Sequence, residues 1–110
     1  MKLLTKAIQS SLPPLYSQEA NPDPVVRCKF FTPDSNWTWF VTEAEPQEDG
    51  DILFFGYVIG HDSEWGYFAY SELSTARGPY GLPIERDLHF KPAPFSEVLA
   101  RYNRERGRVA

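Results

Sequence analysis

The amino-acid sequence predicts an α+β fold: a small curved antiparallel sheet of four to five strands, with a short N-terminal helix and a C-terminal helix. Two observations predict it. Four segments rich in aromatic and β-branched residues follow one another between residues 25 and 70, separated by turn-forming stretches, which favours an antiparallel meander. Apolar residues at helical spacing occur before and after this region.

The N-terminal helix is predicted over residues 6–12. Thr5 is a suitable N-cap, and Leu4, Ile8 and Leu12 form one apolar stripe. Two prolines follow Leu12 and end the helix, because proline interrupts the hydrogen-bond ladder. Four prolines between residues 13 and 24 then predict an extended arm over the surface.

Four strands are predicted over residues 25–32, 37–42, 52–59 and 65–70. In the first, Val26, Cys28 and Phe30 alternate with polar residues and face the core. Turn residues at 33–36 connect the first two strands as a hairpin, and the acidic stretch 43–50 is predicted as a loop. The nearly continuous apolar run at 52–59 predicts a central strand covered on both faces.

The pattern becomes irregular after residue 70. Ser71 begins a short helical turn, and glycines and prolines at 78–83 break regular structure. Residues 84–90 form either a fifth, edge strand or an ordered loop, and Ser96 is the expected N-cap of the C-terminal helix. We expect one domain over residues 1–100 and a basic tail over 101–110 that frays.

Composition excludes several classes of protein. The chain has 110 residues, 42% of them hydrophobic, which is enough for one core. Cys28 is the only cysteine, so no intramolecular disulfide forms and a reducing compartment is favoured. No apolar run reaches the roughly 18 residues of a membrane span, and no signal-peptide core follows the first residues. We therefore expect a cytoplasmic protein.

Charge is distributed unevenly. Between Lys29 and Arg77 there is no lysine or arginine, and the same stretch holds nine acidic residues, whereas basic residues gather in the tail Arg101–Arg108. The five acidic residues between Glu43 and Asp51 have three interpretations, as a solvated loop, as a docking surface or as a source of a catalytic carboxylate pair. The candidate acidic surface comprises Glu43, Glu45, Glu48, Asp49, Asp51, Asp62 and Glu64. Because an acidic body repels phosphate, we expect no direct binding of nucleic acid by the body.

Residues with chemical potential occur without a recognised motif. His61 lies in a predicted turn and His89 on a predicted strand, neither at the spacing of a metal site, so we predict no metal and no cofactor. A buried Cys28 has a raised pKa and little reactivity. Arg86 would need a partner across the sheet, such as Glu72, in a structural ion pair. Trp37 and Trp39 share one face of their strand and are either packed core or an exposed binding surface.

Several ordered strings carry a resemblance to a known family. They include Leu12-Pro13-Pro14-Leu15-Tyr16, Trp37-Thr38-Trp39 and Gly81-Leu82-Pro83-Ile84-Glu85-Arg86-Asp87. With similar strings between them, they resemble the domain-of-unknown-function family 2958 from Met1 to about Phe95. The resemblance implies a small single-domain bacterial protein, often encoded on plasmids and integrative elements near antirestriction and conjugation genes. It implies no catalytic residues.

Two classes of function follow. The first is a non-catalytic protein-interaction module of a bacterial mobile element, whose acidic, aromatic-bearing surface docks on the basic surface of a protein partner. If that partner is a host defence nuclease complex, the module is an antirestriction or anti-CRISPR inhibitor that mimics nucleic acid. The second is a small enzyme of unknown reaction that uses Glu85, Arg86 and His89 or the Glu43–Asp51 carboxylates. An accessory subunit of a conjugation or replication complex is a further alternative. None of these readings involves a membrane.

Overall fold

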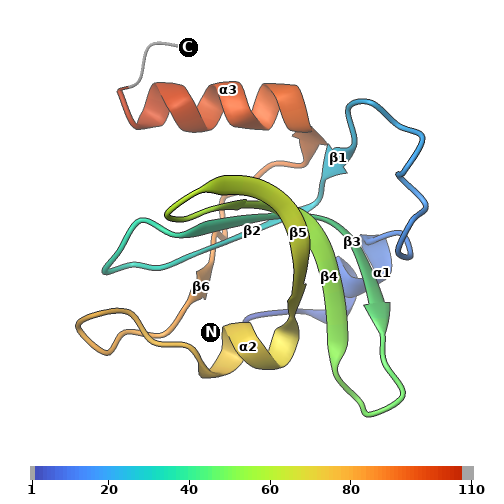
Figure 1. Ribbon diagram of the computed structural model, residues 1–110, viewed down its shortest axis with the longest axis horizontal. Helices are drawn as coiled ribbons and strands as arrows, with labels where there is room; N and C mark the ends of the chain where they lie inside the picture. Colours follow the sequence, from blue (N-terminus) through green and yellow to red (C-terminus); the bar gives the residue numbers. More distant parts are fainter. Residues whose placement is uncertain (1, 108–110) are drawn as a thin grey trace.

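The structure is a computed structural model that describes residues 2–107 (Figure 1). It confirms the predicted α+β class, with an open, curved antiparallel sheet of five strands and helices near both ends of the described chain. The elements are α1 (Lys6–Ser11), β1 (Val25–Val26), β2 (Cys28–Phe31), β3 (Thr38–Pro46), β4 (Ile52–Ile59), β5 (Ser63–Ala69), α2 (Tyr70–Thr75), β6 (Glu85–Arg86), β7 (Ala93–Pro94) and α3 (Phe95–Glu105).

The five-stranded sheet has the order β5-β4-β3-β2-β6, with antiparallel pairs throughout. Its first four strands along the chain, β2 to β5, form the predicted meander. The chain then returns across the sheet, and β6 pairs with β2 at the opposite edge. The short strands β1 and β7 form a separate two-stranded sheet that leads into α3.

Several predicted boundaries agree with the structure and others do not. The strand at 52–59 has the predicted bounds, and Thr5 Oγ1 accepts the Ile8 N–H at 3.2 Å as the predicted N-cap of α1. The predicted loop at 43–50 is wrong in its first half, because β3 continues to Pro46 and pairs with β4 along its whole length. The arm at 13–24 is built largely from consecutive turns rather than extended chain.

The predicted C-terminal tail begins inside a helix. α3 runs to Glu105, and Tyr102 on its inner face is buried against Phe40 of the sheet, with ring centroids 5.8 Å apart. Arg106 Nε donates to the Tyr102 hydroxyl at 3.0 Å. The rest of the predicted tail, residues 108–110, lies outside the described residues.

Side chains pack on both faces of the sheet. One face carries Phe30, Val41, Phe54 and Phe68 and is covered by α1, α2 and the N-terminal segment. The other face carries Phe40 and Ile59 and is covered by α3, β1 and β7. α3 covers only part of this second face, and the arm at 13–24 covers another part of it.

A β-bulge in β3 determines the direction of Glu43. Val41 and Glu43 pair with consecutive residues of β4, so Thr42 is the extra residue. Thr42 Oγ1 donates to the carbonyl of Phe55 at 3.2 Å. In an unbroken strand Val41 and Glu43 would share a face, but the bulge places Glu43 beside Phe55 on the α3 side of the sheet.

No helix within residues 2–107 combines the length and apolar character needed to cross a bilayer.

Candidate functional site

A cavity of about 340 Å³ lies between the arm and the α3-side face of the sheet. Arm residues from Tyr16 to Pro24 form one wall. The other wall consists of side chains from β3, β4 and β5, namely Thr42, Glu43, Phe55, Trp65 and Tyr67. We refer to this cavity as the arm pocket. Its volume lies at the lower end of the range found for ligand pockets.

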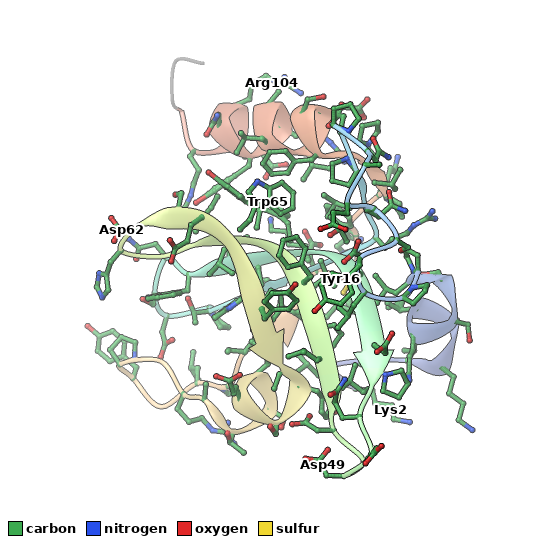
Figure 2. All side chains as sticks on the ribbon, turned by 45° about the vertical axis from the view of Figure 1, so that its right-hand side comes forward. Lys2, Tyr16, Asp49, Asp62, Trp65 and Arg104 are labelled. Carbon is green, nitrogen blue, oxygen red and sulfur yellow. The ribbon has the colours of Figure 1, made fainter. Side chains whose placement is uncertain are left out.

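Stacked aromatic rings form much of the pocket. Phe55 and Trp65 stack with ring centroids 5.8 Å apart and an interplanar angle of 13°, and Phe55 contacts Tyr67 at 4.9 Å. Trp65 is also held from above by Phe95 of α3, at 4.7 Å. Figure 2 shows Trp65 between the sheet and α3, with Tyr16 of the arm on the same side. These contacts hold the aromatic wall in one arrangement before any ligand binds.

Glu43 fixes the arm to the sheet. Its side chain is 4% exposed, and Oε1 accepts the backbone N–H of Tyr16 at 2.9 Å while Oε2 accepts that of Gln18 at 2.7 Å. Tyr16 has φ of 70°, the only positive φ of a non-glycine residue among residues 2–107. This left-handed conformation costs roughly 1–2 kcal/mol, which the two charge-assisted hydrogen bonds offset. Contrary to the sequence-based expectation, Glu43 is therefore not part of an exposed surface.

The polar groups of the arm pocket are anionic or neutral. A hydrogen bond with Tyr16, followed by desolvation and by the nearby charges of Glu43 and Glu19, raises the pKa of Tyr67 above its ordinary 10.0. Among the described residues that line the pocket there is no lysine, arginine or histidine. Two carboxylates beside aromatic faces favour a cationic group.

The other six residues of the candidate acidic surface fall into two groups at opposite ends of β4, and all of them except the half-buried Asp51 are exposed. Glu45, Glu48, Asp49 and Asp51 lie around the β3–β4 turn, and Asp62 and Glu64 lie at the β4–β5 turn. Figure 2 shows Asp49 and Asp62 at these two ends. An eight-residue strand separates the ends by about 27 Å. Nucleic-acid mimicry by one continuous acidic surface gains no support from this arrangement and stays a prediction.

Asp51 has a local structural role. Its Oδ1 accepts the backbone N–H of Ser71 at 3.1 Å and its Oδ2 accepts the Ser71 hydroxyl at 2.6 Å. The hydroxyl hydrogen bond, followed by the backbone N–H of Ile52, lowers the pKa of Asp51 from its ordinary value. Asp51 thus connects the β3–β4 turn to the first turn of α2.

Trp37 and Trp39 stack on each other with ring centroids 5.9 Å apart, and both are half-buried. The edge of His61 meets the Trp37 ring at 5.5 Å, and Trp39 packs against the core on the α1 and α2 side. The pair therefore lies away from the arm pocket, whose aromatic side chains come from the arm, β4 and β5.

Arg86 and His89, two residues of the alternative enzyme, line different cavities. Arg86 lines a cavity of about 360 Å³ beside α1, whereas His89 lines one of about 60 Å³ beside α3. The guanidinium of Arg86 donates through Nη1 to the carbonyls of Lys2 and Leu3. The predicted pairing of Arg86 with Glu72 is wrong, because the N-terminal segment passes beside β6 and its carbonyls accept the hydrogen bonds of the guanidinium. Glu72 instead accepts the backbone N–H of Ala69 at 2.8 Å.

Cys28 is buried as predicted, and burial raises the pKa of its thiol to about 12. It is therefore a core residue rather than a nucleophile. Within residues 2–107, no three histidine, cysteine, aspartate or glutamate side chains are placed to hold a metal ion together.

Sequence reasoning missed the arm pocket because its walls come from distant segments. Trp65 and Tyr67 alternate on β5, as do Phe55 and Tyr57 on β4, which signals an aromatic face. That signal does not reveal that the arm crosses this face. The bulge at Thr42, which turns Glu43 toward the arm, has no local sequence signature.

Comparison with known proteins places the chain in a family. No curated protein and no solved structure shows detectable similarity to it. One family model matches residues 2–110, which is essentially the whole chain. The chain therefore belongs to the family described as "Protein of unknown function (DUF2958)".

Proposed function

We propose that this protein is a non-catalytic interaction module that binds a basic segment of a protein partner, and that the arm pocket is its binding site. The observation that carries the proposal is the combination of Trp65 and Tyr67 with the carboxylates of Glu19 and Glu43 around one cavity. Aromatic side chains at a preformed concave site are typical of protein interaction hot spots.

Charge determines which partner the pocket favours. A guanidinium or ammonium group over an aromatic face gains about 0.5–2 kcal/mol, depending on how far it is desolvated. The carboxylate of Glu19 is exposed and adds a Coulomb attraction that salt screens. Arginine suits the site better than lysine, because its planar group stacks on a ring while it hydrogen-bonds to a carboxylate.

The geometry also favours a polypeptide over a free small molecule. The pocket opens to the surface beside Tyr16 and Tyr67, whose side chains are 63% and 51% exposed. A single side chain can enter the cavity while its backbone lies outside across these rings. Within this proposal, a nuclease of a host defence system is one partner with the required basic surface.

Binding of a labelled arginine-rich peptide, followed by fluorescence anisotropy at low and high salt, tests the proposal. The matched probe replaces each arginine with citrulline, which keeps the shape and removes the charge. We expect the citrulline peptide to bind at least about tenfold more weakly and the arginine peptide to weaken as salt rises.

Two protein variants locate the site. Glu19→Gln removes an exposed charge of the pocket and should weaken binding severalfold, whereas Glu48→Gln removes an exposed charge of the β3–β4 turn and should leave it unchanged. Equal binding of the two peptides, or equal effects of the two variants, would refute the arm pocket as a site for cations.

A further inference from the structure

The outer edge of β5 is open. β5 pairs with β4 on one side, and no strand within residues 2–107 pairs with its other side. Exposed edges in native sheets are usually protected by charged side chains, above all lysine, by proline, by a bulge or by a covering segment, and the one charged residue of β5 is Glu64 near its start. Ser63–Ala69 contains neither lysine nor proline, and its register with β4 is uninterrupted. The edge is therefore able to accept another strand.

The direction of the backbone groups along β5 follows from hydrogen bonds at its end. The N–H of Ala69 donates to Glu72 Oε1 at 2.8 Å instead of to β4, so it points away from the sheet. Because an antiparallel strand alternates with a period of two residues, the N–H and C=O of Tyr67 and Trp65 point outward as well. Three residues that pair across the sheet, Ala44, Phe54 and Phe68, give the same result. The N–H of Ala44 donates to the Pro13 carbonyl on the side away from β4, so Phe54 directs its backbone groups toward β5 and Phe68 directs its own toward β4. The next residue, Tyr67, therefore directs its backbone groups outward.

Trp65 and Tyr67, whose backbone groups point outward from the sheet edge, also line the arm pocket. Trp65 and Tyr67 direct their side chains to the α3-side face, where they form part of the aromatic wall. In an added antiparallel strand, the residues directly opposite Trp65 and Tyr67 would share that face. Alternate side chains of the added strand would therefore lie at the mouth of the pocket.

Charge complementarity identifies the occupant. Asp62 and Glu64 are exposed at the start of β5, Glu19 lies at the pocket, and residues 30–76 contain no lysine or arginine. A second copy of the chain would bring another net charge of −4 to an acidic edge, which disfavours self-association. A basic strand brings the opposite charge.

We propose that β5 receives an extended basic segment of the partner protein as a sixth, antiparallel strand, with arginine or lysine at alternate positions directed to the arm pocket. This inference rests on the proposed function and specifies how the partner backbone is held. Main-chain hydrogen bonds to Trp65 and Tyr67 would supply affinity, and the pocket would select the basic side chains.

Selective backbone methylation tests the inference. The probe is a blocked seven-residue peptide in which arginine alternates with valine. Methylating the arginine nitrogens removes the N–H groups that would face β5, and we expect affinity to fall at least about tenfold. Methylating the valine nitrogens, which would face solvent, is the matched control and should leave affinity within about twofold.

A second measurement follows the protein. Binding of the unmethylated peptide should slow hydrogen exchange of the Trp65 and Tyr67 amides and leave those of Gly66 and Phe68, already paired with β4, unchanged. Binding with equal affinity for both methylated peptides would overturn strand addition and leave the pocket intact. No binding of the parent peptide would overturn the proposed function as well. A dimer of the protein alone, with Trp65 and Tyr67 protected, would assign the edge to a second copy.

Discussion

Glu43 Oε1 accepts the backbone N–H of Tyr16 at 2.9 Å, and this contact joins two irregular points of the backbone. Glu43 follows the bulge of β3, and Tyr16 has the left-handed φ of the arm. Each irregularity would be unfavourable alone, and together they bring a carboxylate to two backbone donors. The position of the arm, and with it one wall of the pocket, depends on this carboxylate.

Replacing Glu43 with glutamine should destabilise the fold. An amide offers one oxygen to the two N–H groups of Tyr16 and Gln18, and its NH₂ group faces the other donor. We expect the free energy of unfolding to fall by about 1–3 kcal/mol, as for a buried donor that loses its acceptor. Urea denaturation measures the change. Glu45→Gln, at an exposed position on the same strand, is the control and should stay within about 0.5 kcal/mol.

Two paired glycines should respond differently to alanine. A Cβ at Gly56 would lie 1.9 Å from the backbone oxygen of Phe40, whereas one at Gly66, its partner on β5, would meet nothing within 4 Å. We expect Gly56→Ala to destabilise the fold by about 3 kcal/mol or more and Gly66→Ala by less than about 0.5 kcal/mol. Thermal or urea unfolding of the two variants is the measurement. Similar losses in both would contradict the close approach of β3 and β4 at the bulge.

Asp23 should make stability depend on acid pH. It accepts the Ser96 hydroxyl at 2.6 Å and the Ser96 N–H at 2.8 Å, and these hydrogen bonds lower the pKa of Asp23 from its ordinary 3.8. A carboxyl with a lowered folded-state pKa stabilises the fold above its ordinary pKa, and this contribution is lost as the pH falls through the lowered value. Asp23→Asn should therefore be less stable than the natural protein at pH 7, with the difference shrinking below about pH 3.8.

The matched control for Asp23 is Glu48→Gln, at an exposed turn position. Its unfolding free energy should stay within about 0.5 kcal/mol of that of the natural protein at pH 7. A constant difference between Asp23→Asn and the natural protein down to the most acidic pH would show that the carboxylate charge has no part in holding α3.

The thiol of Cys28 should be unreactive while the protein is folded. Burial raises its pKa to about 12, so the thiolate that attacks alkylating reagents is nearly absent at pH 8. Iodoacetamide should modify Cys28 only after unfolding in urea, which mass spectrometry detects. Rapid modification of the folded protein would show that the core around β2 opens easily.

The sequence contained enough information for the meander but not for its irregular parts. The run at 52–59 is apolar along its length and was predicted with its observed bounds, because a central strand is covered on both faces. Residues 43–46 belong to an acidic stretch that ends in Asp49-Gly50 and therefore predicts a loop, yet pairing with β4 makes them part of β3. The strand propensity of a residue does not take into account the strand beside it, and here pairing with β4 decides that residues 43–46 are strand.

The candidate site could be predicted less well than the fold. Glu43 was singled out for its charge, but its contacts to Tyr16 and Gln18 span 27 and 25 residues of sequence. Arg86 was expected to need a partner, and its partners are the backbone carbonyls of Lys2 and Leu3, 84 and 83 residues earlier in the chain. Such contacts depend on which segments the fold brings together, and no local pattern records them.

The bond between Arg86 and the carbonyl of Lys2 has a consequence for biosynthesis. The two residues are 84 positions apart, so the ribosome must add 84 residues after Lys2 before this anchor can form. At 5–20 residues per second this interval lasts about 4–17 s. During that time the carbonyls of Lys2 and Leu3 lack their guanidinium partner, so hydrophobic packing alone must hold the first leucines against the sheet.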